Sequence, residues 1–201
     1  MIYKKIIRPI LFLFPPEFVH DFTLFWLGIC SKIPFLRNNI FQICNYSSPR
    51  LKQNFFGLYF RTPIGLAAGM DKNASAANIW NSFDFGWCQL GSITNLAQAG
   101  NKKPRLWRLP QDKGLVINYG LSNIGAQAVL NKLKNQTKSR GLWSISIAKS
   151  KNVAMEKATE DYAQSFSTLQ SLGDIITINL SCPNVKNFIG LQEKHLLEPI
   201  L

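Results

Sequence analysis

Residues 63–73 read Pro-Ile-Gly-Leu-Ala-Ala-Gly-Met-Asp-Lys-Asn, and this stretch decides the fold. Within it, Ile64–Ala68 is a compact apolar run that ends at Gly69. A short apolar run bounded by turn residues is typical of a strand buried on both faces of a parallel sheet. Asp71 and Lys72 follow directly. We therefore expect a buried strand with a polar loop at its carboxyl end.

The same alternation of strand and helix recurs along the chain. We expect a strand pair near Leu58–Phe60, helices over Asn73–Phe83, Asn123–Lys134 and Met155–Leu172, and strands over Trp87–Gly91, Leu142–Ala148 and Ile175–Leu180. This order predicts an α/β fold with a parallel sheet. A (β/α)8 barrel needs about 250 residues. The chain therefore accounts for about the first four units of a partial TIM barrel, or for an open doubly wound sheet.

Polar residues gather where these strands are expected to end. They are Asp71, Lys72, Ser92, Asn118, Lys149, Asn179 and Asn184. In a TIM barrel the active site lies at the carboxyl ends of the strands. These residues are the candidates for binding and catalysis.

Residues 1–46 have a different character from the rest and form a predicted N-terminal helical segment, ahead of a barrel region over 47–201. Residues 17–44 are dense in Phe, Leu and Trp, with Lys or Arg at the margins. This composition suits helices lying in a membrane interface, and equally helices packed on the protein. Arg8 and Pro9 interrupt the first apolar run, which is shorter than the roughly 20 residues of a membrane span. Neither export nor a transmembrane helix is expected.

Composition limits the class of partner. The chain has 201 residues, 46% of them hydrophobic, and a formal charge of +12. An anionic partner such as lipid headgroups or a carboxylate ligand suits this charge, and no basic block indicates nucleic acid. The four cysteines lack paired Cys-x-x-Cys spacing, which favours a reducing compartment. With two histidines in the whole chain, no metal site is expected.

Residues suited to ligand binding and catalysis lie in short segments. Ala67–Gly69 has no side-chain bulk, so a flat ring can approach its backbone. Lys72 supplies a point charge that can hold a carboxylate. Asn179 and Asn184 offer amide donors and acceptors that suit a pyrimidine or a flavin. Cys182 lies between these two asparagines and precedes a proline.

The segments 63–73, 103–109 and 178–184, in this order, resemble the dihydroorotate dehydrogenases. Arg8–Phe12, followed by Pro15-Pro16-Glu17 and His20, is similar to the start of the class 2 enzymes of that family. The resemblance implies FMN as cofactor, oxidation of dihydroorotate to orotate, and quinone as the final electron acceptor. It also implies a peripheral position on the cytoplasmic face of the membrane, with the N-terminal helices forming the quinone entrance.

The resemblance assigns roles residue by residue. Cys182 matches the catalytic base. The substrate-binding positions are Lys72, Asn118, Asn179 and Asn184. The cofactor-binding positions are Ala68, Gly69, Lys72, Ser92, Ser146 and Asn179, with Ser92 standing where relatives have Thr.

Four departures accompany the resemblance. Class 2 enzymes usually have Ser as the base, whereas Cys182 is typical of class 1. A single residue, Tyr119, separates Asn118 from Gly120, where the family has two, and Ser146 replaces an Asn. The family's FMN-phosphate loops belong to the second half of the barrel, so the 201-residue chain alone is expected to be inactive. The alternatives are a soluble class 1-type enzyme with another acceptor and a truncated barrel acting as a basic binding module.

Overall fold

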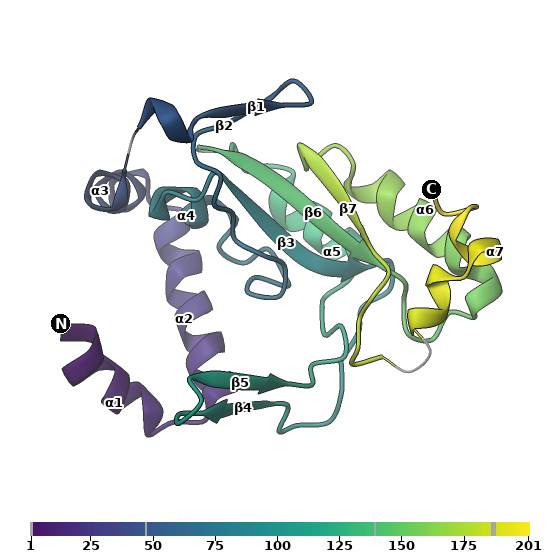
Figure 1. The fold of residues 1–201 in the computed structure, drawn as a ribbon, viewed down its shortest axis with the longest axis horizontal. Helices are drawn as coiled ribbons and strands as arrows, with labels where there is room; N and C mark the ends of the chain where they lie inside the picture. Colours follow the sequence, from purple (N-terminus) through teal and green to yellow (C-terminus); the bar gives the residue numbers. More distant parts are fainter. Residues whose placement is uncertain (1, 47, 139, 186–187) are drawn as a thin grey trace.

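The centre of the fold is a parallel sheet of three strands, β3 (Trp87–Thr94), β6 (Leu142–Ala148) and β7 (Ile175–Asn179), in that order (Figure 1). The structure is a computed structural model, and it describes residues 2–46, 48–138, 140–185 and 188–201. β6 has the predicted bounds. β3 runs past the predicted end at Gly91, and β7 ends one residue earlier than predicted.

The predicted first strand is reduced to a single bridge. Leu66 pairs with Cys88 in parallel, and the Leu66 amide donates to the Trp87 carbonyl at 3.0 Å. A regular strand does not form over Ile64–Ala68, and Gly69 with a φ of +104° turns the chain away after it. Among the described residues, no strand pairs with the free edge of β7. The sheet is therefore open and matches part of a barrel rather than a closed one.

The helices are shorter than predicted because side chains before them capture backbone amides. α4 (Ala77–Trp80) begins late, since the Asp71 carboxylate accepts hydrogen bonds from the amides of Ser75 and Ala76. α5 (Ala126–Leu133) begins after Asn123, whose side-chain oxygen accepts from the Gly125 amide. The predicted helix 155–172 divides into a 3-10 turn, Met155–Lys157, and α6 (Ala158–Leu169). Another 3-10 turn, Asn81–Phe83, follows α4.

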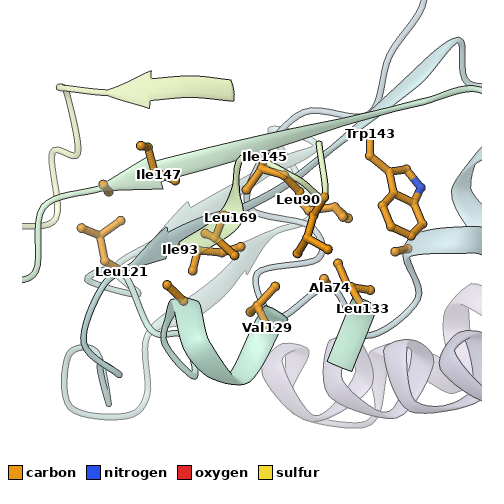
Figure 2. Packing of buried hydrophobic residues seen from close by; sticks show 14 of the residues in the cluster. Ala74, Leu90, Ile93, Leu121, Val129, Leu133, Trp143, Ile145, Ile147 and Leu169 are labelled. Atoms are coloured by element: carbon orange, nitrogen blue, oxygen red, sulfur yellow. The ribbon is translucent and has the colours of Figure 1, made fainter. Parts of the chain in front are cut away.

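One face of the sheet is apolar and is covered by α5 and α6. Val129 and Leu133 of α5 and Leu169 of α6 meet Leu90, Ile93, Ile145 and Ile147 of the strands (Figure 2). All seven are at most 1% exposed. Full burial of such a side chain contributes about 1.5–3 kcal/mol, so this layer is the main source of stability. The strands alternate, and their other face carries polar side chains.

The N-terminal segment is helical, as predicted. It contains a π-helical turn (Tyr3–Ile7), α1 (Arg8–Phe12), α2 (Pro16–Ser31) and α3 (Pro34–Cys44). α2 exposes a stripe formed by Phe18, Phe22, Phe25 and Trp26, which are 50–61% exposed. In the described part of the chain no single helix has the length and hydropathy of a membrane span, although the pair Tyr3–Phe12 and Pro16–Ser31, bent by 115°, reaches them together.

Two hairpins and a C-terminal segment complete the fold. β1 (Gln53–Phe55) pairs with β2 (Leu58–Phe60), as expected from the sequence. β4 (Leu106–Leu109) pairs with β5 (Gly114–Ile117) beside the N-terminal end of α2, and this hairpin was not predicted. Short elements are found at Pro49–Leu51, Phe188–Gln192 and α7 (Lys194–Leu197). The boundary predicted between residues 46 and 47 falls next to Ser47, which lies outside the described residues.

Candidate active site

Three of the predicted site residues meet on the polar face of the sheet. The hydroxyl oxygens of Ser92 on β3 and Ser146 on β6 lie 2.7 Å apart. The side-chain amide of Asn179, the last residue of β7, donates to the Ser92 oxygen at 2.8 Å. Both serines are buried. Three adjacent strands thus contribute one polar side chain each to a connected group, which we call the serine–asparagine cluster.

Two residues that the sequence did not single out support this cluster. The Tyr162 hydroxyl on α6 donates to the main-chain oxygen of Asn179 at 2.6 Å. Gln89, three residues before Ser92, donates to the Thr177 hydroxyl at 2.7 Å and accepts from the Ala68 amide at 3.3 Å. Gln89 thus connects the polar face of the sheet to the loop after the first bridge. Side chains alternate between the two faces of a strand, so the apolar Leu90 next to Gln89 could have indicated that Gln89 lies on the polar face of the sheet.

The turn at residues 68–72 lies against the end of β3. The Gly69 amide donates to the Gly91 carbonyl at 2.8 Å, and the Gly91 amide donates to the Asp71 carbonyl at 3.1 Å. A Cβ built on Gly69 would meet no atom within 4 Å. The backbone at Gly69 is therefore open on one side and beside the serine–asparagine cluster. This open backbone with adjacent amide and hydroxyl groups fits the edge of a flavin ring.

Lys72 extends from this turn towards an aromatic ring. Its Nζ donates to the Gly69 carbonyl and lies 4.0 Å from the centre of the Tyr119 ring. Burial lowers the pKa of Lys72, and the positive charge of Arg105 lowers it further. The Tyr119 hydroxyl is buried and has no hydrogen-bond partner among the described residues. Lys72 and the Tyr119 ring thus border a common space.

That space is a cavity of about 720 Å³. It is lined by Leu27 of α2, by Ala68 and Lys72 of the 66–72 loop, and by Leu106 and Ile117 of the β4–β5 hairpin, among other residues. Apart from Lys72 and His20, its lining is largely apolar. An apolar cavity with a few polar groups is the usual form of a small-molecule site. The cavity places the N-terminal helices next to the predicted cofactor-binding turn.

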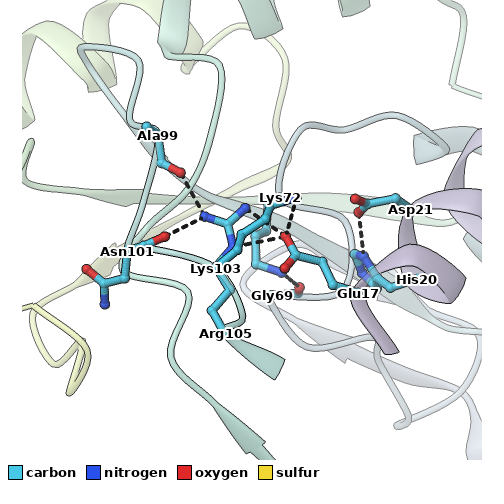
Figure 3. Close-up of polar contacts among 9 residues, drawn as sticks. All are labelled: Glu17, His20, Asp21, Gly69, Lys72, Ala99, Asn101, Lys103 and Arg105. Atoms are coloured by element: carbon cyan, nitrogen blue, oxygen red, sulfur yellow. Dashed lines mark hydrogen bonds and ion pairs between the residues drawn. The ribbon is translucent and has the colours of Figure 1, made fainter. Parts of the chain in front are cut away.

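An ion-pair network joins α2 to this site (Figure 3). Glu17 accepts from the Arg105 side chain at 2.9 Å and pairs with Lys103 at 3.2 Å. His20 lies with its Nε2 2.9 Å from the Met70 carbonyl oxygen. His20 is therefore held by the backbone of the candidate site. In the sequence, Glu17 and Arg105 stand out only as parts of longer motifs, whereas in the structure they form a buried pair.

The predicted substrate residues Asn118 and Asn184 are brought together by a third asparagine. The Asn101 side-chain amide donates to the Asn118 side-chain oxygen at 2.8 Å and to the Asn184 carbonyl at 3.1 Å. Asn118 is exposed and Asn184 is half-buried. Asn101 precedes the Lys103–Leu109 motif by two residues, which is the signal that could have identified it.

Cys182 lies in the loop between Asn179 and Asn184 and is half-buried. Burial raises the pKa of its thiol, and hydrogen bonds from the backbone amides of Asn184 and Val185 offset part of this effect. Among the described residues, no hydrogen bond joins Cys182 to the serine–asparagine cluster. The Nζ of Lys149 donates to the carbonyls of Ser150 and Val153 in its own loop, and in the part of the chain that the structure describes no hydrogen bond joins it to the serine–asparagine cluster.

Comparison with known proteins places this geometry in context. Residues 50–201 match the family described as Dihydroorotate dehydrogenase. The chain is 40% identical to "Dihydroorotate dehydrogenase (quinone)" of Trichormus variabilis, over all of this chain and 56% of the relative. It is 39% identical to the protein of that name from Corynebacterium efficiens, over 95% of this chain and 50% of the relative.

Solved structures give the same picture. The crystal structure of DHODH from Eimeria tenella in complex with ferulenol superposes with a TM-score of 0.79 and 31% sequence identity. The match covers 92% of this chain and 49% of that protein. The chain therefore spans about half the length of the relatives that it matches.

Proposed function

Because the chain belongs to the dihydroorotate dehydrogenase family, we propose that it supplies half of an active site that oxidises dihydroorotate to orotate with FMN, and that quinone is the final electron acceptor. The proposal concerns a complete enzyme containing this half. The reaction belongs to de novo pyrimidine biosynthesis. The 201-residue chain by itself is expected to be inactive.

The observation that carries the proposal is the serine–asparagine cluster beside the open backbone at Gly69. Three hydrogen-bonding side chains from adjacent strands meet a turn whose outer side is free of neighbours. Strand ends of this kind hold the site in α/β barrels. When bound, FMN would supply the hydride acceptor. Ala68, Gly69, Ser92, Ser146 and Asn179 would hold its ring by close backbone approach and hydrogen bonds.

Substrate binding falls to the other predicted residues. Lys72 would hold the carboxylate of dihydroorotate, because its ammonium group lies at the edge of the cofactor-binding turn. Asn179 and Asn184 would bind the amide groups of the pyrimidine ring. Asn118 would contribute a further amide, with Asn101 fixing its orientation.

Cys182 would act as the base that takes the C5 proton. A thiol has an ordinary pKa of about 8.5, so its thiolate is accessible near neutral pH, unlike the alkoxide of a serine. The raised pKa of Cys182 makes the thiolate scarcer and more basic. The proton would pass to the thiolate sulfur as the C6 hydride leaves the substrate.

Quinone would reach the site through the 720 Å³ cavity between α2 and the hairpin. The exposed aromatic stripe of α2 supports a peripheral position on the membrane. The cytoplasmic face follows only from the resemblance to class 2 enzymes. Cys182 favours a second candidate, a soluble class 1-type enzyme with another acceptor. The two candidates differ in the acceptor that reoxidises the flavin.

The test uses a complete enzyme containing this half, purified with bound FMN. Dihydroorotate added without oxygen should bleach the flavin absorbance, and a quinone should restore it. Restoration by fumarate but not by quinone would support the class 1 alternative. Retention of RNA without any flavin absorbance would instead indicate a basic binding module.

A further inference from the structure

A separate cavity of about 620 Å³ lies between α2, the loop around Asn73–Ser75, and α5. It shares no lining residue with the 720 Å³ cavity of the candidate active site. Its lining includes two lysines, Lys32 at the end of α2 and Lys132 on α5. The proposed reaction uses neither of them.

The floor of this cavity holds a partly buried ammonium group. The Nζ of Lys132 donates to the Asn73 carbonyl at 2.8 Å and to the Ser75 hydroxyl at 3.4 Å. These two acceptors are neutral, so they fix the position of the charge without neutralising it. Among the described residues, no carboxylate forms an ion pair with Lys132 or Lys32. The nearby Asp71 carboxylate accepts from the backbone amides of Ser75 and Ala76 and from the Trp80 ring.

The charge of Lys32 acts on Lys132. Burial lowers the pKa of Lys132, Asp71 opposes this effect, and the charge of Lys32 lowers the pKa again. Two cations that face one cavity repel, and an anion between them would relieve that repulsion. Lys132 at the floor of the cavity and Lys32 at its edge therefore form a positively charged site that is complementary to an anionic group.

The position of α2 beside this floor is fixed by close backbone contact. A Cβ built on Gly28 would lie 2.8 Å from the Ser75 carbonyl oxygen, so the helix approaches the loop more closely than a side chain would allow. This contact holds α2 close to the loop that carries Asn73 and Ser75. The cavity is therefore formed by fixed elements of the fold.

The other side of the cavity is apolar and continues onto the exposed surface. Phe25 and Ile29 line it, and both are also exposed on α2. Phe25 belongs to the aromatic stripe with Phe18, Phe22 and Trp26, and its ring packs edge-on against Trp26 at 5.6 Å between centroids. A ligand here would have its charge on the lysines and its apolar part along Phe25 and Ile29.

We propose that this cavity binds the phosphate group of an anionic phospholipid, with Lys32 and Lys132 on the phosphate and the acyl chains along Phe25 and Ile29. The inference rests on the proposed membrane position and deepens it, because it adds a defined headgroup site to a general apolar contact. One carboxylate, Asp21, stands at the rim and lies 3.2 Å from His20. Its charge leaves a net positive cavity and weakens the binding of any anion.

The first test measures flotation of the full chain with vesicles of phosphatidylcholine alone, or of phosphatidylcholine mixed with phosphatidylglycerol. The variant Lys32→Gln with Lys132→Gln should lose roughly tenfold or more of its affinity for the mixed vesicles and keep its binding to phosphatidylcholine. The matched control Lys134→Gln with Lys157→Gln removes the same charge from exposed positions outside the cavity and should behave as the parent. Asp21→Asn should bind the mixed vesicles more tightly.

The second test does not need a membrane. Reductive methylation followed by peptide mass spectrometry reports how accessible each lysine is in the folded parent chain. Short-chain phosphatidylglycerol below its micelle concentration should protect Lys132 but not Lys134, and short-chain phosphatidylcholine should protect neither. This readout requires no variant to fold.

Each outcome has a distinct meaning. Protection of Lys132 without flotation of the parent would support the lipid site and reject the proposed membrane position. Equal flotation by the cavity variant and the parent, or an equal loss in the cavity and control variants, would overturn the inference. So would protection of Lys132 by inorganic phosphate at the same concentration as the lipid, since the ligand would then be a free anion.

Discussion

The hydroxyl oxygens of Ser92 and Ser146 lie 2.7 Å apart on neighbouring parallel strands, and both side chains are buried. Ser146 stands where the family resemblance places an asparagine. Its hydroxyl is too short to reach as far as an amide, but it still orients Ser92, which also accepts from Asn179. We therefore expect the cofactor side of the proposed site to depend on this pair.

The first prediction concerns that pair. Ser146→Ala should weaken FMN binding roughly fivefold, because a typical hydrogen bond contributes about 1 kcal/mol. Titration of the apoprotein of a complete enzyme with FMN, followed by flavin fluorescence, measures the change. Ser167→Ala, at an exposed position of α6 outside the cluster, is the control and should leave the affinity unchanged. An unchanged affinity in Ser146→Ala would remove Ser146 from the site.

The second prediction concerns Cys182. Burial raises the pKa of its thiol, so the thiolate fraction at neutral pH is lower than that of a free cysteine. Flavin reduction by dihydroorotate should therefore increase with pH, with a midpoint above the ordinary thiol value of about 8.5. Cys182→Ala should lose roughly 10²–10⁴-fold in the reduction rate and retain orotate binding. Stopped-flow absorbance of the bound flavin measures this step, and Cys30→Ala serves as the control.

The variant Cys182→Ser tests whether Cys182 acts as a base or only fills space. A serine hydroxyl fills nearly the same space but loses its proton far less readily, so its rate should fall and its pH dependence should move to higher pH. If Cys182→Ala reduces its flavin as fast as the parent at every pH, the base lies elsewhere.

The third prediction concerns the charge of Lys72. Burial and the charge of Arg105 lower its pKa, so Lys72 loses its proton at a lower pH than an exposed lysine with an ordinary value of about 10.4. The affinity for orotate should decrease as the pH rises through this lowered pKa. Lys72→Met should bind orotate weakly and without that alkaline decrease. Spectral titration of the flavin with orotate checks both statements, and a parent-like alkaline decrease in Lys72→Met would contradict them.

The fourth prediction concerns the buried pair that attaches α2. Burial alone would raise the pKa of Glu17, but hydrogen bonds and charges from Arg105 and Lys103 outweigh it and lower the pKa. The pair therefore contributes its full stability above the unfolded carboxyl value of about 4.3, and this contribution is lost as the pH falls through the lowered folded pKa.

Glu17→Gln removes one partner of this pair. It should destabilise the docking of α2 by about 2 kcal/mol, since Arg105 loses its charged partner but keeps the carbonyls of Ala99 and Asn101 as acceptors. Urea unfolding of the full chain at neutral pH, followed by tryptophan fluorescence, measures the loss. Glu198→Gln, in an exposed pair with Lys194, should change the stability by less than about 0.5 kcal/mol. Equal values for the two variants would show that the pair contributes little.

The elements that sequence predicted well are those whose burial is uniform. β6 matches its predicted bounds because Leu142–Ala148 is buried along nearly its whole length. The β4–β5 hairpin was missed although Leu115–Ile117 is apolar, because this run is only three residues long and its side chains are exposed rather than part of the core. The starts of α4 and α5 were predicted too early, because the side chains of Asp71 and Asn123 accept hydrogen bonds from backbone amides ahead of these helices. Ser92 and Asn179 could be proposed from strand ends and Ser146 only from the family resemblance, whereas Gln89 and Asn101 act through partners far away in the sequence.

The separation between Glu17 and Arg105 has a consequence for synthesis. The two residues are 88 positions apart, so at roughly 5–20 residues per second Glu17 is made about 4–18 s before its partner. During that time α2 has no hairpin to dock on, and its aromatic stripe is accessible on the nascent chain. A chaperone at the ribosome, or the bilayer itself, therefore meets this helix before the sheet exists.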